Sequence, residues 1–379
     1  MSEKKLINVL YVTHYSSLYG ANRSLLALID GLNKNKFKPF VILPKEGQLE
    51  EELKKRNITY YIFPIKTWMA STRIKAPLRL IMNLLSLPIL IWRVNSWKID
   101  LVHTNSSVTP IGAWIAFLSG LPHIWHIREF GWEDYQLKYD LGRGQFEYWL
   151  NKADHVITVS EAIQKKVLKR ISTPSSIIYN GVISQEEANN LPQNRSHGID
   201  GDTIFGIIGV LRPSKGQEQA IKAFSTVNRN FPKTKLWIAG SGSEEYEHYL
   251  HNLTIELNIS EQVNFLGYVD DPFKFYSKID IALVCSKNEG MGRVTAEAMV
   301  AGKPIIGLDS AGTSELIDDG QTGLLYDGSV DQLISKMKYG INNDLTDLSQ
   351  NSRKKGIKEF TTEDYSKRVK DIYKHILDR

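Results

Sequence analysis

The clearest structural pattern in the chain runs from Ile279 to Asp309 and reads IDIALVCSKNEGMGRVTAEAMVAGKPIIGLD. It opens with a continuous apolar run, which is typical of a strand that is buried on both faces. A glycine-rich turn follows, a helical pattern begins near Arg293, and a second apolar run, KPIIGLD, closes the segment. This order predicts a parallel βαβ unit, because two parallel strands need a long crossover connection.

The same alternation of strand-like and helical patterns continues towards the N-terminus. The other strand-like runs are Ile7 to Tyr15, Pro39 to Leu43, Thr59 to Phe63, Ile99 to Asn105, His123 to Glu129, His155 to Ser160, Thr203 to Leu211, Lys235 to Gly240 and Val263 to Val269. Helical patterns separate them. The sequence therefore predicts an α/β fold whose parallel sheets are covered by helices on both faces.

A polar segment divides this pattern into two parts. Residues 184–202, SQEEANNLPQNRSHGIDGD, have no apolar periodicity and predict a linker. We therefore expect two Rossmann-like, doubly wound domains that face a cleft, at residues 1–183 and 203–358, followed by a final helix at 359–379. Ligands of such sheets bind outside the carboxyl ends of the strands, so the loops there should contain the functional residues.

Composition excludes several classes of protein. The 379 residues include one cysteine, Cys285, which excludes a disulfide framework and fits a reducing compartment. The N-terminus, MSEKKLINVLYV, has no signal-peptide core. The most apolar stretch, Leu80 to Trp92, is shorter than the about 20 residues of a spanning helix. We therefore expect a cytoplasmic protein without a transmembrane segment.

The charge is unevenly distributed. Residues 1–180 have 24 Lys and Arg against 14 Asp and Glu, a net charge of +10, whereas the remainder has 23 against 28, or −5. A basic half suits an anionic membrane or substrate, and chance asymmetry of solvated charges explains it equally well. The apolar segment from Ile74 to Trp97 is either a core helix or a peripheral contact with membrane lipid. Nucleic acid is not expected, because no dense basic run interleaves with aromatic residues.

Two glutamates, Glu289 and Glu297, flank the glycine-rich turn and the predicted helix start. Glycines permit backbone conformations that are closed to other residues, and the free N–H groups of a helix start bind anions such as a diphosphate. Glu297 could accept hydrogen bonds from ribose hydroxyls, and Glu289 from a sugar ring. A plain turn with solvated glutamates has the same spacing, so spacing alone does not separate the two interpretations.

The stretch EGMGRVTAEAMVAGKPII resembles the signature of retaining glycosyltransferases of family 4, which have the GT-B fold. A second element of that family follows from Ala311 to Tyr326, and the resemblance continues in order along almost the whole chain. It implies transfer of a sugar from a UDP- or GDP-sugar to a glycan or lipid-linked acceptor, with no metal or other cofactor. It also implies that the first domain binds the acceptor, that the second binds the donor and that the final helix crosses back to the first.

The resemblance also assigns the donor diphosphate to Arg212 and Lys215, in GVLRPSKGQEQAIKAF. Arg binds two phosphate oxygens at once, and Lys acts as a point charge. Cations at a helix start oppose the helix dipole, so a bound anion would explain them, although solvated surface charges are a plainer alternative.

A histidine in PHIWHIREFG, Pro122 to Gly131, matches one that the family places beside the anomeric carbon. His126 fits best and His123 is the alternative. The following Arg128 and Glu129 depart from the Asp of many relatives, which leaves the sugar and the acceptor contacts open. The predicted catalytic residues are His126, Glu289, Arg212 and Lys215.

Further donor contacts are predicted in the loops after strands. Ala21 departs from the Gly-Gly that the family often shows after the first strand, and the backbone of Tyr268 or Val269 could read the base. The predicted donor-binding residues are Gly20, Ala21, Gly240, Gly242, Tyr268, Val269, Gly290, Met291, Gly292, Arg293, Val294, Thr295 and Glu297.

Other chemistry finds little support in the sequence. Asp200-Gly201-Asp202 has the form of a metal-binding pair but lies in the polar linker, where turn residues are common. No zinc, dinucleotide or serine-hydrolase motif is present. Two rival functions stay open. A nucleotide-sugar epimerase or hydrolase on the same fold would convert the donor without an acceptor. A non-catalytic protein would bind a sugar nucleotide, or a membrane, without turnover.

Overall fold

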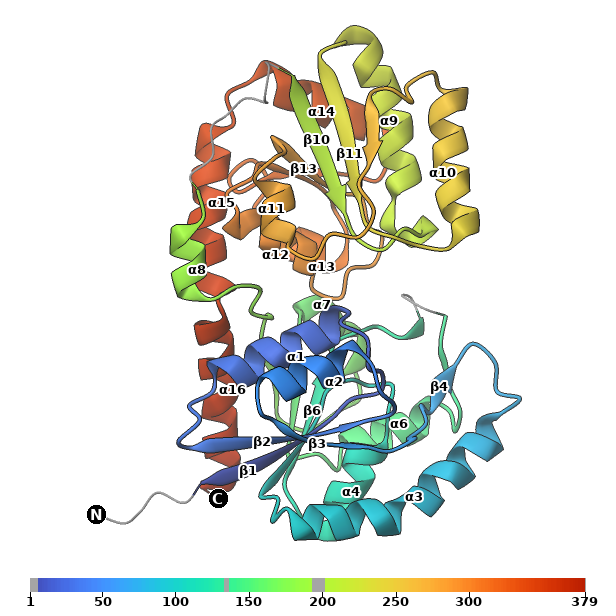
Figure 1. The fold of residues 1–379 in the computed structure, drawn as a ribbon, viewed down its shortest axis with the longest axis vertical. Helices are drawn as coiled ribbons and strands as arrows, with labels where there is room; N and C mark the ends of the chain where they lie inside the picture. The colour runs from blue at the N-terminus through green and yellow to red at the C-terminus, as the bar shows by residue number, and fades with distance from the viewer. Residues whose placement is uncertain (1–5, 133–135, 193–201, 379) are drawn as a thin grey trace. The chain divides into compact units, whose positions relative to one another are not determined.

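The computed structural model describes residues 6–132, 136–192 and 202–378. The chain divides into two compact units (Figure 1). Unit 1 comprises Met1–Gly181 and Thr362–Arg379, and unit 2 comprises Val182–Thr361. Each unit is built around its own parallel sheet, so the α/β fold class predicted from the sequence is confirmed.

The sheet of unit 1 has seven strands. In spatial order they are β3 (Thr59–Ile62), β2 (Phe37–Leu43), β1 (Ile7–Val12), β5 (Leu101–Thr104), β6 (His123–Ile127), β8 (His155–Thr158) and β9 (Ser175–Ile177). A short antiparallel pair, β4 (Met69–Ala70) and β7 (Lys138–Tyr139), lies outside this sheet. The strand order reverses between β1 and β5, and such a switch point is where open α/β sheets bind ligands.

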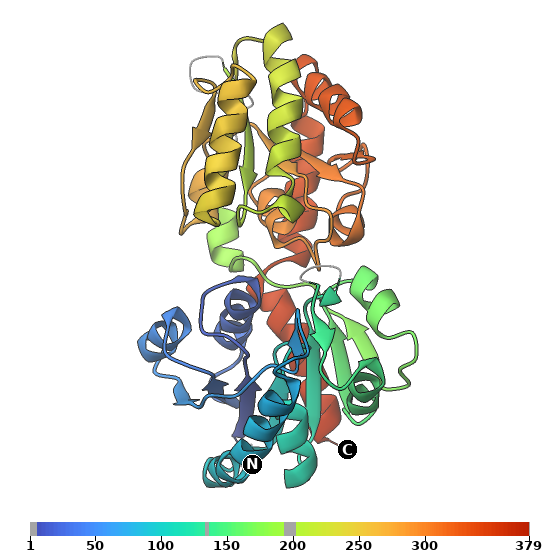
Figure 2. The ribbon, with the colours of Figure 1, turned by 90° about the vertical axis from the view of Figure 1, so that its right-hand side faces the viewer.

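The helices of unit 1 cover both faces of its sheet (Figure 2). They are α1 (Gly20–Gly31), α2 (Gln48–Lys55), α3 (Ala76–Ser96), α4 (Ile111–Ser119), α6 (Arg143–Leu150), α7 (Glu161–Val167) and α16 (Thr362–Leu377). The last helix, α16, packs against α1, and a Cβ atom at Gly31 would overlap the Ser366 side chain. One face of α16 completes the core of unit 1 with Tyr365, Val369, Tyr373 and Ile376.

The sheet of unit 2 has six strands. In spatial order they are β12 (Val263–Phe265), β11 (Thr234–Ala239), β10 (Thr203–Ile208), β13 (Ile281–Val284), β14 (Ile305–Leu308) and β15 (Leu324–Tyr326). The helical elements are α8 (Gln185–Asn190), η2 (Pro213–Lys215), α9 (Gln217–Asn230), α10 (Glu244–Glu256), α11 (Pro272–Tyr276), α12 (Arg293–Val300), α13 (Ala311–Leu316), α14 (Val330–Asn342) and α15 (Thr346–Glu359). The switch point of this sheet lies between β10 and β13.

The polar segment predicted as a linker is not uniformly irregular. Helix α8 begins there because Ser184 and Glu187 form a capping box, in which each side chain binds the other's backbone N–H. Of the predicted Asp-Gly-Asp turn, Asp200 and Gly201 lie outside the described residues, and Asp202 forms an ion pair with Lys235 at 2.8 Å.

Helix α3 is longer than the apolar stretch that we singled out in the sequence. It has 21 residues and, by length and composition alone, is the one described helix that could cross a membrane. Only 28% of its most apolar window is buried. This low burial counts against the interpretation of the segment as a core helix of unit 1.

Candidate active site

The carboxyl edge of the unit 2 sheet brings together four of the predicted loops. Arg212 and Lys215 follow β10, and Gly240 and Gly242 follow β11. Tyr268 and Val269 follow β12, and the segment from Glu289 to Glu297 follows β13. Parallel strands end at the same edge, so these segments are neighbours there. The loops after β10 and β13 flank the switch point, where a ligand is expected.

An ion pair links the two loops at the switch point. Lys215 Nζ lies 2.5 Å from Glu289 Oε1, and the two side chains are 21% and 13% exposed. The backbone explains why they meet, because Lys287 N–H donates to the Ser214 carbonyl at 3.1 Å. Gly216 adopts φ +75°, and a Cβ atom there would overlap the Cys285 carbonyl. Glycine therefore allows the loop after β10 to rest directly on the end of β13.

The environment of Glu289 keeps its carboxyl group ionised. Burial alone would raise the pKa of Glu289, but the positive charge of Lys215 and hydrogen bonds from Lys215 and Ser286 outweigh it. Arg212 contributes in the same direction, and the net pKa of Glu289 is lowered. Glu289 is therefore a carboxylate at neutral pH and can only accept hydrogen bonds.

The start of helix α12 forms the second half of this edge. Gly292 caps the helix in the left-handed conformation, with φ +86°, and within the described structure no side chain caps the first N–H groups. The hydroxyl of Thr295 is fully buried and has no hydrogen-bond partner among the described residues. It lies beside Gly292, since a Cβ atom there would be 3.0 Å from Thr295 Oγ1. An oriented helix start and an unsatisfied hydroxyl together favour an anionic ligand.

The preceding turn is supported from behind. Gly312 N–H donates to the Glu289 carbonyl at 3.0 Å, and a Cβ atom at Gly312 would overlap the backbone of Met291. Met291 is buried, so its side chain holds the turn in place rather than facing solvent. Ser310 contributes a hydrogen bond to the Lys287 carbonyl at 2.7 Å.

Glu297 has a partner within its own helix. Arg293 Nε lies 2.9 Å from Glu297 Oε1, and the Glu297 side chain is 6% exposed. Such a buried carboxylate needs a paired cation to offset the loss of hydration. The predicted contact of Glu297 with ribose stays a prediction. Val294 contributes its carbonyl to the Tyr276 hydroxyl at 2.8 Å.

The glycines after β11 have a role in backbone packing. A Cβ atom at Gly240 would overlap the Gly209 carbonyl, and one at Gly242 would overlap Leu211. These two positions need glycine because the loops after β10 and β11 touch, whether or not a nucleotide also approaches. Tyr268 is 55% exposed in the loop after β12, so its backbone role towards a base stays a prediction.

The carboxyl edge of the unit 1 sheet contains the other predicted residues. Gly20 opens α1 after the β1 loop, again without a side-chain cap in the part of the chain described, and a Cβ atom there would meet nothing within 4 Å. The carbonyl of Ala21 accepts a hydrogen bond from Asn105 Nδ2 at 3.1 Å. Asn105 directly follows β5, so this contact joins the two sides of the β1–β5 switch point.

His126 lies in β6 near this edge and belongs to a buried polar network. Its Nδ1 is 3.3 Å from Arg128 Nη2 and 3.2 Å from His103 Nε2. His103 Nδ1 is 2.7 Å from the Tyr373 hydroxyl, which itself lies 3.2 Å from the Tyr11 hydroxyl. The network thus connects β1, β5 and β6 to the C-terminal helix.

The chemistry of the donors determines the tautomer of His126. A guanidinium has no acceptor, so Arg128 must donate to His126 Nδ1, and the ring proton of the neutral imidazole lies on Nε2. Burial, with smaller contributions from Arg128 and His103, lowers the pKa of His126 well below its ordinary value. His126 is therefore neutral, and its Nε2–H is buried with no partner among the residues described. It is a donor that is available to a ligand.

Arg128 is itself held in position by three other residues of unit 1. It donates to Asn105 Oδ1 at 2.8 Å, to the Tyr365 hydroxyl at 2.8 Å and to Asn180 Oδ1. Glu129 binds Ser106 and Ser107, and burial raises its pKa although those hydrogen bonds lower it in part. The two residues that depart from the family pattern therefore have structural partners in unit 1.

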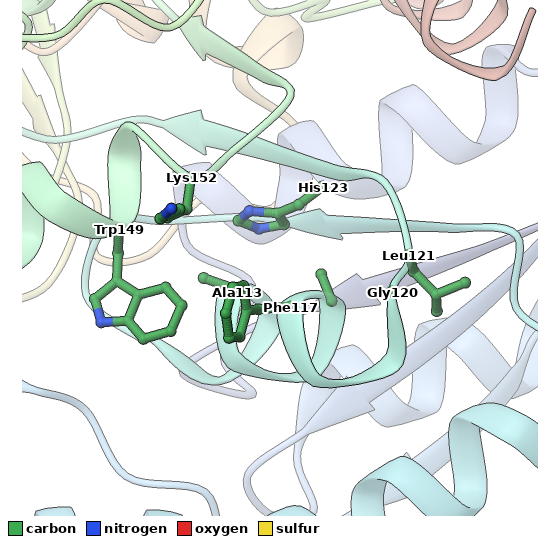
Figure 3. A pocket seen from close by; sticks show the side chains of 8 residues that line it. Ala113, Phe117, Gly120, Leu121, His123, Trp149 and Lys152 are labelled. Carbon is green, nitrogen blue, oxygen red and sulfur yellow. The ribbon is translucent and has the colours of Figure 1, made fainter. Parts of the chain in front are cut away.

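His123, the alternative to His126, lies at the opposite edge of the sheet. It begins β6, its Nε2 is 2.7 Å from Thr104 Oγ1, and burial lowers its pKa to about 3. It lines a hollow of about 190 Å³ between α4 and α6, with Phe117, Trp149 and Lys152 (Figure 3). This hollow is at the amino ends of the strands, away from the edge where the predicted residues gather.

The sequence did not identify several members of the unit 1 network. His103, Asn105 and Tyr373 have no motif around them. The spacing of Tyr365, Val369 and Tyr373 was the only signal, because residues four apart share one face of a helix. Among the described residues no group of three or more His, Cys, Asp or Glu could hold a metal ion.

Two family models match the chain and together extend over nearly its whole length. The model for Glycosyltransferase Family 4 matches residues 19–186, and the model for glycosyl transferases group 1 matches residues 191–359. An uncharacterized glycosyltransferase of Methanocaldococcus jannaschii is 28% identical over 293 residues, which cover 75% of this chain and 78% of that protein. The capsular polysaccharide biosynthesis glycosyltransferase CapM of Staphylococcus aureus is 22% identical over 242 residues, covering 59% and 62%.

A solved structure supports the same conclusion about the fold. HepE of Anabaena, crystallised in complex with UDP-glucose, superposes with a TM-score of 0.81 at 20% identity, over 97% of this chain and 100% of that chain. The two Rossmann-like units are those of the GT-B fold. With both family models matched in order and the signature glutamates placed at one sheet edge, the chain belongs to glycosyltransferase family 4 and is a glycosyltransferase that uses nucleotide-sugar donors.

Proposed function

We propose that the enzyme transfers a hexosyl group from a UDP-sugar to a hydroxyl of a glycan or lipid-linked acceptor, with retention of anomeric configuration and without a metal ion. The observation that carries the proposal is the Lys215–Glu289 pair beside the uncapped start of α12, at the switch point of the unit 2 sheet. HepE was solved with UDP-glucose and CapM is named for capsular polysaccharide, which supports this donor and this class of acceptor.

The diphosphate would bind to donors that unit 2 already holds in place. Lys215 has three N–H donors, and its bond to Glu289 uses one of them. Arg212, the first N–H groups of α12 and the Thr295 hydroxyl would supply the rest. Fixed positive charge of this kind stabilises a leaving diphosphate without a bound cation.

In unit 2, Glu289 would hold the sugar, because its carboxylate can accept hydrogen bonds from sugar hydroxyls. In unit 1, the His126 Nε2–H would donate a hydrogen bond to a sugar oxygen.

Transfer would then proceed on one face of the sugar. The bond between C1 and the β-phosphate oxygen breaks, and its electron pair leaves with UDP. The acceptor oxygen forms its bond to C1 on the same face, and its proton passes to the departing phosphate oxygen. No protein carboxylate needs to attack C1 in this scheme. We place the reaction in the cytoplasm, a reducing compartment, because the single cysteine, Cys285, is buried as a free thiol.

Donor binding, product configuration, metal dependence and acceptor dependence each test one part of the proposal. In a thermal-shift screen of UDP-, GDP- and ADP-sugars, only UDP-sugars should raise the melting temperature clearly, since a ligand that binds the folded state stabilises it. With UDP-glucose and a glycan acceptor, NMR should show an α-linked product, and EDTA should leave the rate unchanged. An inverted product or loss of activity in EDTA would refute the corresponding part, and free glucose or an epimer formed without acceptor would favour the rival function.

A further inference from the structure

Helix α3 exposes an apolar face that has no partner among the described residues of unit 1. The large side chains on this face are Leu78, Ile81, Met82, Leu84, Leu85, Ile89 and Trp92, with exposed fractions of 37% to 72%. Most are spaced three or four residues apart, so they form one stripe along the helix. In Figures 1 and 2 the helix lies at the periphery of unit 1. A surface helix of a soluble protein ordinarily turns polar residues outwards, so this stripe is unusual.

The opposite face ties the helix to unit 1. Asn83 is buried and its side chain bonds the Lys66 N–H at 2.8 Å and the Lys66 carbonyl at 2.9 Å. Near the N-terminal end, Arg79 forms an ion pair with Asp140. Leu87 and Val94 continue the buried side. The buried face thus combines polar anchors with apolar side chains, and it holds the helix against unit 1 along its length.

The charged residues within this segment of the sequence are all basic, and in the described part of the chain Arg79 alone among them is paired with an acidic residue from elsewhere, Asp140. From Pro64 to Lys98 the sequence contains six Lys or Arg and no Asp or Glu. Arg73 and Lys75 precede the helix and are exposed, and Arg93 lies 5.0 Å from the ring of Trp92 near its end. Apolar residues flanked by basic and aromatic side chains are typical of helices that lie in the interface of an anionic bilayer.

We propose that α3 binds the surface of an anionic lipid bilayer, with its axis in the membrane plane and its exposed stripe among the headgroups and upper acyl chains. The basic residues that flank the stripe favour lipid over a second copy of the chain as its partner. Two such faces packed together in either direction would oppose basic residues with basic residues, whereas anionic headgroups complement them. This surface is separate from the proposed donor site and goes beyond the proposed reaction.

Flotation of the full chain with lipid vesicles tests whether the exposed stripe of α3 binds a bilayer. We expect binding to vesicles of phosphatidylcholine and phosphatidylglycerol, and at least tenfold weaker binding by Leu85→Glu. Ile255→Glu is the matched control, because Ile255 on α10 is 62% exposed and Leu85 is 72% exposed. It should bind like the wild type, and both variants should keep the wild-type melting temperature. An equal loss of binding in the two variants would overturn the proposal.

A second pair of variants tests the charge. Arg73→Gln with Lys75→Gln should weaken binding to the anionic vesicles severalfold, and added salt should reduce the difference. Lys169→Gln with Arg170→Gln removes the same charge from another exposed site and should have less effect. The proposal is wrong if the wild type does not float with the anionic vesicles, or if it forms a dimer that Leu85→Glu dissociates, since a second copy would then cover the face.

Discussion

The carboxyl edges of the two sheets are built from different chemistry. In unit 2 the edge contains an ion pair, Lys215 with Glu289, beside an uncapped helix start. In unit 1 it contains a neutral imidazole, His126, held by a buried network that extends to Tyr373. The first arrangement presents fixed charge, and the second presents one oriented hydrogen-bond donor. The comparison shows that two parallel α/β sheets in one chain can offer different chemistry to a ligand at their carboxyl edges.

The largest expected effect is that of pH on stability, which should fall in unit 1 more than in unit 2 as the pH is lowered. Burial lowers the pKa values of His103, His123 and His126 below the about 6.5 of an exposed histidine, so the unfolded chain binds protons that folded unit 1 does not. Stability is therefore retained above about pH 6.5 and lost as the pH falls below it. The three residues together should remove about 4 kcal/mol between pH 7.5 and 5.5, at about 1.4 kcal/mol each.

Urea unfolding followed by tryptophan fluorescence measures this loss, because seven of the eight tryptophans lie in unit 1 and only Trp237 lies in unit 2. None of the described histidines of unit 2 is buried, so hydrogen exchange in unit 2 should change less with pH. Equal midpoints at pH 7.5 and 5.5 would contradict the prediction.

Loss of charge at the unit 2 edge should have the next largest effect. Lys215→Met should lower kcat/KM roughly 100- to 1,000-fold, or about 3–4 kcal/mol, because fixed charge at the leaving group is lost. It should also destabilise the fold modestly, by about 1–2 kcal/mol, since Glu289 loses its partner. Steady-state kinetics and urea unfolding measure the two quantities.

Two control variants separate catalysis from folding in this prediction. Combining Lys215→Met with Glu289→Gln should restore stability but not activity, because the unpaired charge is gone while the phosphate contact is still missing. Lys222→Met removes an exposed ion pair with Glu218 on α9 and should change neither quantity appreciably. A double variant that regains activity would show that Lys215 serves the fold alone.

Removal of the central cation of the unit 1 network should mainly reduce stability. Arg128→Met removes the charged donor to the buried acceptors Asn105 Oδ1 and Asn180 Oδ1, at an expected cost of about 3 kcal/mol. Arg143→Met is the control: Arg143 is 52% exposed, and the loss of its pair with Glu147 should cost less than about 0.5 kcal/mol. Urea unfolding followed by tryptophan fluorescence distinguishes them, and similar costs would count against a buried network.

The smallest effect is expected at the far end of the network. Tyr373→Phe removes the hydroxyl between Tyr11 and His103 and should cost about 1 kcal/mol of stability. Nitrogen-15 NMR should still find the proton of His126 on Nε2, because Arg128 alone enforces that tautomer. A switch to Nδ1–H would show that Tyr373, not Arg128, orients the ring. Tyr339→Phe, at a 48% exposed site, is the control for loss of a hydroxyl.

Local pattern was sufficient for much of unit 2. The glycine turn at Gly292, the helix start at Arg293 and the cations after β10 could be located because each depends on residues close together in the chain. The packing roles of Gly240 and Gly242 could not, because they depend on which loops touch across the sheet edge. The pairing of Arg293 with Glu297 is local, because the two residues are four apart on one helix, and it competes with the predicted contact to ribose.

By itself the sequence determined the alternation of strands and helices, the division into two α/β units and the family to which the chain belongs. Periodicity and turn chemistry are local, and each short segment therefore specifies its own element. Only the tertiary structure decided which polar groups meet, as in the contact between His103 and Tyr373, 270 positions apart. It also decided which side of α3 packs inwards, because a helix that is apolar on both faces does not reveal from its pattern alone which face finds a partner.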